Sequence, residues 1–155
     1  MILHSKPWIT DTDIASVVDV LKSGMIAQGN VSAMFEQEIS QWVGAIDGVA
    51  VGCGAGAIVL ALRALEICEL DEVILPTYVC PSVLDAVVSS GSIPILCDVG
   101  EDWVVSDKNI KEVLSQRSKA IIIPHMYGIS ADINSLKAIA LPIIEACAPA
   151  LAHKG

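Results

Sequence analysis

Five short apolar runs, rich in β-branched residues, recur along the chain at a nearly constant interval. They begin at residues 49, 72, 93, 120 and 142, so successive starts lie 21 to 27 residues apart. Each interval has room for a helix and two tight connections, as a crossover between parallel strands requires. The pattern predicts an α/β fold with three αβα layers and a mostly parallel sheet. The predicted strands are Val49–Gly52, Glu72–Leu75, Ile93–Cys97, Ala120–Pro124 and Pro142–Glu145.

Helices are predicted in the intervals between these runs. An apolar face at helical spacing extends from Ala57 to Leu65, and Pro81 and Gly91 bracket the next helix. Asp107 precedes a further segment whose lysine and arginine lie toward its end, as the helix dipole favours.

Two amphipathic helices are predicted ahead of the first strand. Thr12 or Asp11 is expected to cap the first helix, which ends at Gly24. Asn30 is expected to cap the second, which ends at Gly44. Neither helix belongs to the repeat, so we expect them to form an arm that leads into the sheet.

Length and composition favour one domain with a deep core. The chain has 155 residues, of which 54% are hydrophobic and 17% charged, whereas an average soluble domain has about 25% charged residues. We expect residues 1–155 to form a single domain, with the helical arm at residues 1–45 and the βα repeats at residues 46–155.

The charge and the hydropathy pattern exclude several kinds of partner. A formal charge of -9 repels nucleic-acid phosphates and anionic lipid surfaces. The longest uncharged stretch after Asp47, residues 48–62, is shorter than the roughly 18 apolar residues of a membrane span. The first residues do not have the pattern of a signal peptide. We therefore expect a cytoplasmic protein that binds neither nucleic acid nor membrane.

The last predicted strand is followed by only ten residues, ACAPALAHKG. A parallel sheet needs cover on both faces, so a missing layer leaves apolar surface exposed. We expect the chain to associate, as a homodimer or a larger oligomer, or to be part of something larger.

The segment GCGAGA, residues 52–57, lies where a strand gives way to a helix. Glycines at such a turn let backbone N–H groups approach an anion, although close packing is an equally good explanation. The segment is neither a dinucleotide fingerprint nor a P-loop.

Other polar residues also follow predicted strands. His125 ends one of them, where α/β sheets collect ligands, but it also fits a structural role beside Tyr127. Cys147 as a nucleophile with His125 as its base is a minor alternative. Asp98, Glu101 and Asp102 are better explained as a solvated loop, and the histidines and cysteines lack metal-ligand spacing.

A series of segments spans the whole chain in unbroken order. It begins with KPWITDTDIASVVDVLKSGMIAQGNVSAMFEQEISQWVG and continues with VAVGCGAGAIVLALRAL, DEVILPTYVCPSVLDAVVSSGSIPILCDV, KAIIIPHMYGISADINSL and PIIEACAPA. This series resembles the N-terminal half of the DegT/DnrJ/StrS sugar aminotransferases. The resemblance implies the large domain of a fold-type I enzyme that uses pyridoxal phosphate, forms a dimer and acts on nucleotide-linked keto-sugars.

The resemblance also implies where the cofactor phosphate lies. The family holds it in a Ser-Gly-Thr turn, which corresponds here to Cys53, Gly54 and Ala55. Both hydroxyls are replaced, while the backbone donors remain.

Three more positions correspond to contacts with the rest of the cofactor. The aromatic residue that stacks on the ring is Cys80 here, with Tyr78 nearby, and the Asp that pairs with the pyridine nitrogen is Ala146. Pro149 replaces the Gln that contacts the cofactor hydroxyl.

The family's Schiff-base lysine lies beyond the segment that the last residues match, and Lys154 corresponds to an earlier Lys-Gly. The resemblance thus implies an aminotransferase-like chain that is inactive alone. The alternatives are a non-catalytic dimerisation or regulatory module, and one subunit of a split enzyme whose lysine comes from a second chain.

Overall fold

Four parallel strands form the centre of the fold. The computed structural model describes residues 5–148, so Pro149 and Lys154 lie outside the described residues. Hydrogen bonds join the strands in the order β2-β1-β3-β4. The strands are β1 (Glu72–Pro76), β2 (Ile93–Cys97), β3 (Ser118–Pro124) and β4 (Ile143–Ala146). The predicted α/β class and four of the five predicted strands are confirmed.

The strand predicted at Val49–Gly52 is wrong. These residues form no strand and pair with none of the described ones. A β-strand exists only where a neighbour satisfies its backbone N–H and C=O groups, and a run of β-branched residues does not supply that neighbour.

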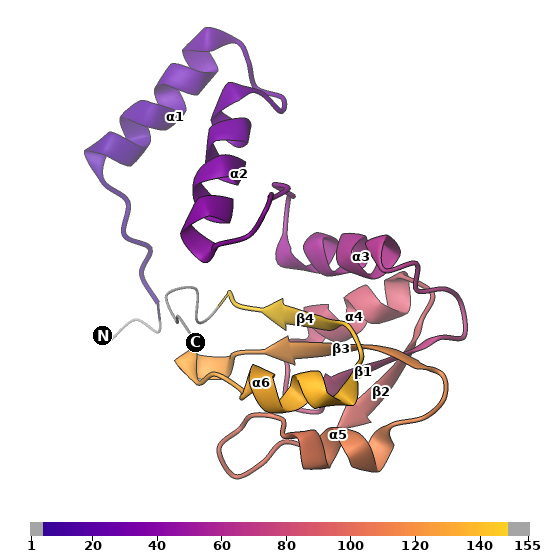
Figure 1. The fold of residues 1–155 in the computed structure, drawn as a ribbon. Coiled ribbons are helices and arrows are strands. Elements are labelled where there is room, and N and C mark those ends of the chain that lie inside the picture. Colours follow the sequence, from indigo (N-terminus) through magenta and orange to yellow (C-terminus); the bar gives the residue numbers. More distant parts are fainter. Residues whose placement is uncertain (1–4, 149–155) are drawn as a thin grey trace. The chain divides into compact units, whose positions relative to one another are not determined.

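Helices precede the sheet and connect its strands (Figure 1). They are α1 (Asp11–Ser23), α2 (Asn30–Val43), α3 (Gly54–Ala64), α4 (Pro81–Ser89), α5 (Asp107–Val113) and α6 (Ile133–Leu136), with short 3-10 turns η1 (Met126–Gly128) and η2 (Lys137–Ile139). None of the described helices is long and apolar enough to cross a membrane.

The described chain divides into two compact units at Ala50/Val51, with α1 and α2 in the first and the sheet in the second. In the first unit the Glu36 carboxylate accepts a hydrogen bond of 2.8 Å from the Ala50 N–H. α1 has no buried residue, and Ser40 is the one buried residue of α2.

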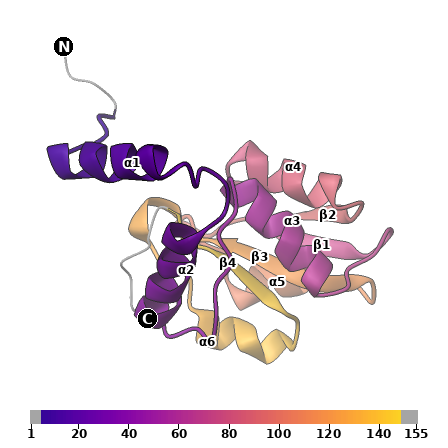
Figure 2. The ribbon, with the colours of Figure 1, turned by 90° about the horizontal axis from the view of Figure 1, so that it is seen from above.

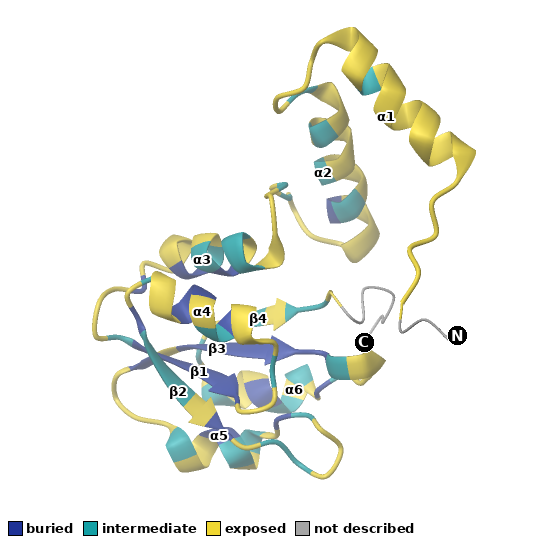
Figure 3. Cartoon of the chain, turned by 180° about the vertical axis from the view of Figure 1, so that it is seen from behind, coloured by how far each residue is buried: buried dark blue, intermediate teal, exposed yellow. Residues whose placement is uncertain are grey.

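Side chains alternate along the strands and make two cores, one on each face of the sheet. Val73 of β1 and Ile122 of β3 pack with α3 and α4, whose positions over the strands are visible in Figure 2. Ile74 and Ile121 point the other way and pack with α5 and α6. Figure 3 shows that β1 and β3 are the buried strands, as expected for the middle of a three-layer arrangement.

The ends of the first two helices are predicted more accurately than their caps. Both end at glycines in the left-handed conformation, Gly24 and Gly44, as expected. Thr10, rather than Thr12 or Asp11, caps α1. Thr10 and Asp13 exchange hydrogen bonds, a reciprocal arrangement that satisfies two N–H groups at once.

At α2 the cap is Gly29, so the expectation for Asn30 is wrong. Gly29 is extended and makes no side-chain hydrogen bond, and Asn30 is already the first helical residue. An extended backbone conformation at the residue before the first turn, and not a polar side chain, defines this helix start.

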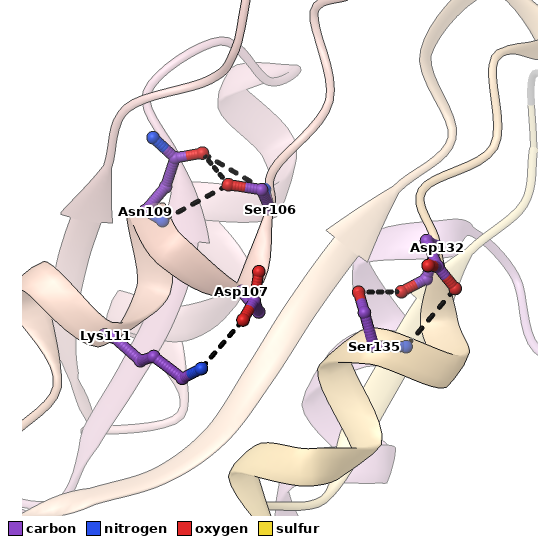
Figure 4. A network of polar contacts seen from close by, with 6 residues as sticks. All are labelled: Ser106, Asp107, Asn109, Lys111, Asp132 and Ser135. Atoms are coloured by element: carbon purple, nitrogen blue, oxygen red, sulfur yellow. Dashed lines mark hydrogen bonds and ion pairs between the residues drawn. The ribbon is translucent and has the colours of Figure 1, made fainter.

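Polar residues also fix the starts of α5 and α6 (Figure 4). Ser106 caps α5, and Asp107 is its first helical residue. Ser106 Oγ accepts from the Asn109 N–H, and the Asn109 side chain accepts from the Ser106 N–H in return. The Asp132 carboxylate accepts from the Ser135 N–H at 3.2 Å and opens α6. These caps hold the helices that cover one face of the sheet.

A charged cluster closes the amino end of β1, away from the carboxyl ends of the strands. The Glu72 side chain is 4% exposed and pairs with Arg117 at 2.6 Å. It also accepts a hydrogen bond from Ser115. The Ser115 hydrogen bond first, and then Arg117, lower the pKa of Glu72 against the opposing effect of burial.

We predict that Glu72→Gln makes unfolding less dependent on pH. A lowered folded-state pKa stabilises the fold above the ordinary glutamate pKa, and this stabilisation is lost as pH falls through the folded value. Urea unfolding at several acidic pH values measures the effect. The exposed Glu69→Gln is the control, and an equal pH dependence in wild type and Glu72→Gln would contradict the prediction.

Candidate active site

A cavity of about 710 Å³ lies at the carboxyl edge of the sheet. The first turns of α3 and α4 and the ends of β3 and β4 line it. Parallel strands bring all their carboxyl ends to one edge, which is where α/β proteins bind ligands. Most of the positions that the resemblance assigned to the cofactor line this cavity, namely Cys53, Gly54, Ala55, Cys80 and Ala146. Tyr78 is not part of the lining, and Pro149 lies outside the described residues.

The glycine turn enters the cavity at the start of α3. A Cβ added at Gly52 or Gly54 would meet no atom within 4 Å, and neither residue has a left-handed backbone. Close packing therefore does not explain these two glycines among the described residues. Without side chains at these positions, a ligand can approach the backbone at the start of α3.

Cys53 occupies part of that first turn. It is the N-cap of α3, and its Sγ accepts from the Gly56 N–H at 3.4 Å. One of the free N–H groups that could contact an anion is thus satisfied within the chain.

Cys80 is the N-cap of α4 and is exposed. Its thiol lies 3.1 Å from Ser82 Oγ, and hydrogen bonding with Ser82 lowers the pKa of Cys80 against the effects of burial and of the Asp85 charge. Cys147, which follows β4 and also lines the cavity, behaves differently: burial and then the charge of Glu145 raise its pKa.

His125 and Glu145 join the ends of β3 and β4. His125 Nδ1 accepts from the Ala131 N–H at 3.4 Å, so the ring proton belongs on Nε2, which donates to Glu145 Oε2 at 3.0 Å. The sequence placed both residues at strand ends but did not pair them. Their pairing follows from the adjacency of β3 and β4, which no local motif signals.

Cys147 completes a cluster in which side-chain donor atoms of His125, Glu145 and Cys147 lie within 4.8 Å of one another. The imidazole has no free lone pair to accept a proton from Cys147 or to bind a metal ion, because Nδ1 accepts from the Ala131 N–H and Nε2 carries the proton. In this arrangement His125 serves neither as a base for the Cys147 thiol nor as a metal ligand.

Tyr78 lies outside the cavity lining, in a separate group of aromatic side chains. Tyr78, Trp103 and Tyr127 follow β1, β2 and β3. The rings of Tyr78 and Trp103 are 4.8 Å apart, and the hydroxyls of Tyr78 and Tyr127 lie 2.6 Å apart. The hydrogen bond to Tyr127, then its charge, raises the pKa of Tyr78.

The chain belongs to the DegT/DnrJ/EryC1/StrS aminotransferase family, whose sequence profile matches residues 7–154. It is similar to UDP-N-acetyl-3-dehydro-alpha-D-glucosamine 3-aminotransferase of Acidithiobacillus ferrooxidans, with 34% identity over 96% of this chain and 41% of that protein.

Solved structures of aminotransferases have the same fold. An aminotransferase from Psychrobacter cryohalolentis superposes with a TM-score of 0.88 at 31% identity, over 93% of this chain and 38% of that one. NtdA from Bacillus subtilis, with bound cofactor PMP, gives 0.84 at 28% identity, over 90% and 34%. The chain thus spans about a third to two fifths of the length of these relatives.

We predict that Tyr127→Phe lowers the pKa of Tyr78 toward the ordinary tyrosine value, because the shared hydrogen bond is lost. The chain has two tyrosines, so the variant retains one and its ultraviolet phenolate titration reports Tyr78 alone. The Trp103→Phe variant keeps both hydroxyls and serves as the control. A Tyr78 titration that stays above the ordinary tyrosine range in Tyr127→Phe would refute the hydrogen bond as the cause.

Proposed function

We propose that this chain is an aminotransferase-family protein that does not catalyse transamination on its own. The observation that carries the proposal is the side-chain chemistry of the cavity. Among the described residues, no lysine, arginine or histidine lines it, and Glu145 is its single charged residue. Transamination requires an amine that binds the cofactor covalently, and this cavity offers none.

The cavity does not fit pyridoxal phosphate. The resemblance assigns to Ala146 the position of the Asp that keeps the pyridine nitrogen protonated, and a methyl group cannot do so. Cys53 and Ala55 replace the hydroxyls of the phosphate turn. Glu145 does not substitute for the missing carboxylate, because it precedes Ala146 on β4 and is held by His125.

The relatives suggest what the complete reaction would be. One of them is named for a nucleotide-linked keto-sugar substrate. A split enzyme would need a second chain that supplies both the lysine and the cofactor contacts that this cavity lacks, whereas a non-catalytic relative would need neither.

We predict that the purified chain, given pyridoxal phosphate, glutamate and a keto-sugar nucleotide, produces no amino sugar. After borohydride reduction, mass analysis should find no covalent lysine adduct. Turnover by the chain alone, or one stoichiometric adduct at a single lysine, would overturn the proposal. A sugar aminotransferase of this family run in parallel shows that the assay detects activity.

Assembly is a second candidate function, supported by the exposed face of α1. This face carries apolar side chains at helical spacing, and all of them are exposed: Ile14, Val17, Val18 and Leu21. Within the first unit this face covers no core, and an exposed apolar face of this kind is an interaction surface. A homodimer or larger assembly through this face is the arrangement we propose, with a second chain as the alternative.

We predict that Val17→Glu weakens self-association by at least about tenfold, since it places a charge within the apolar face. Sedimentation velocity over a concentration series measures the change. Ser16→Glu, on the neighbouring polar side of α1, is the matched control. A wild-type chain that stays monomeric at all concentrations would rule out the homodimer.

A further inference from the structure

We propose that the cavity at the carboxyl edge of the sheet binds a small, uncharged, largely apolar molecule in place of the family cofactor. The inference builds on the proposed function in one respect, namely that pyridoxal phosphate does not occupy this space. It goes further because it assigns the cavity a ligand class of its own.

The cavity has the size and walls of a ligand site. Its volume of about 710 Å³ lies within the range of small-molecule pockets, roughly 300–1,000 Å³. Its floor consists of Ile58, Val83 and Pro124, which are buried and belong to packed elements. Because these side chains belong to the core, this part of the cavity wall is preformed in the absence of a ligand.

The lining is apolar. Ser82 and Glu145 are the only residues with oxygen-bearing side chains among the described residues that line the cavity. Most others are Ala, Val, Ile, Pro or Met, and three are cysteines, which behave as small hydrophobic residues when they do not react. Such walls favour contact with an apolar body over contact with water.

The charge of the lining disfavours binding of an anionic ligand. Glu145 brings a negative charge to the wall, and the described lining has no cationic side chain to compensate an anionic ligand. The helix starts at α3 and α4 favour an anion through their dipoles, but this effect is modest and limited to the first turn. The Cys53 thiol has also taken one of the N–H groups of α3.

A matched pair of fluorescent probes tests the inference. Anilinonaphthalene is uncharged and apolar, and its sulfonate has the same ring body with one negative charge. We expect the uncharged probe to bind the full chain at least about tenfold more tightly than the sulfonate, with fluorescence that rises and shifts to the blue. Equal or tighter binding of the sulfonate would overturn the inference.

Variants of α3 locate the bound probe. Ala61 lines the cavity, whereas Ala64 is exposed on the same helix outside the lining. We expect Ala61→Trp to weaken binding of the uncharged probe at least about tenfold and Ala64→Trp to leave it unchanged. Equal effects of the two substitutions, or no effect of Ala61→Trp, would overturn the inference.

A second cavity variant covers the case in which Ala61→Trp does not fold. Ala146→Asp adds a charged group to the lining and should also weaken binding of the uncharged probe. Retained full affinity in a folded Ala146→Asp chain contradicts the inference. Failure of this inference is distinguishable from failure of the proposed function. Tighter binding of the sulfonate without a lysine adduct overturns only the ligand class. A lysine adduct after borohydride reduction overturns the proposed function.

Discussion

The parallel hydrogen-bond ladder between β1 and β3 is the constraint on which the rest of the second unit depends. Val73 and Ile74 pair with Ala120 and Ile121, so neighbouring residues of each strand point to opposite faces. Each face then needs its own helical layer, and the two cores form on either side of one pair of strands. Removing either layer would expose one side of both strands to water.

The same ladder determines where a ligand can bind. Because all four strands are parallel, the segments after them emerge at one edge, together with the starts of α3 and α4. The cavity is a consequence of this packing and does not depend on any catalytic side chain. The side chains that line such a cavity can therefore differ in chemistry without any change in the fold.

Features that depend on neighbouring residues are predicted more accurately from the sequence than features that depend on residues far apart in the chain. The strand at Ile93–Cys97 is predicted to the residue, because its apolar run is bounded by Gly91 and Ser92 on one side and by Asp98 on the other. The run at Val49–Gly52 looks the same but forms no strand, since pairing depends on a neighbour that is distant in sequence. Helix caps differ by one or two residues, because Thr10 and Ser106 each have polar neighbours that could also cap.

The sequence by itself determined the fold class, the family and the chemical character of the cavity, because periodicity, motif order and residue type are all local properties of the chain. Only the tertiary structure decided which side chains meet. His125 pairs with Glu145, and Tyr78 with Tyr127, because their strands lie at particular positions in the sheet. Strand order results from packing and crossover geometry over long separations, and no short segment encodes it.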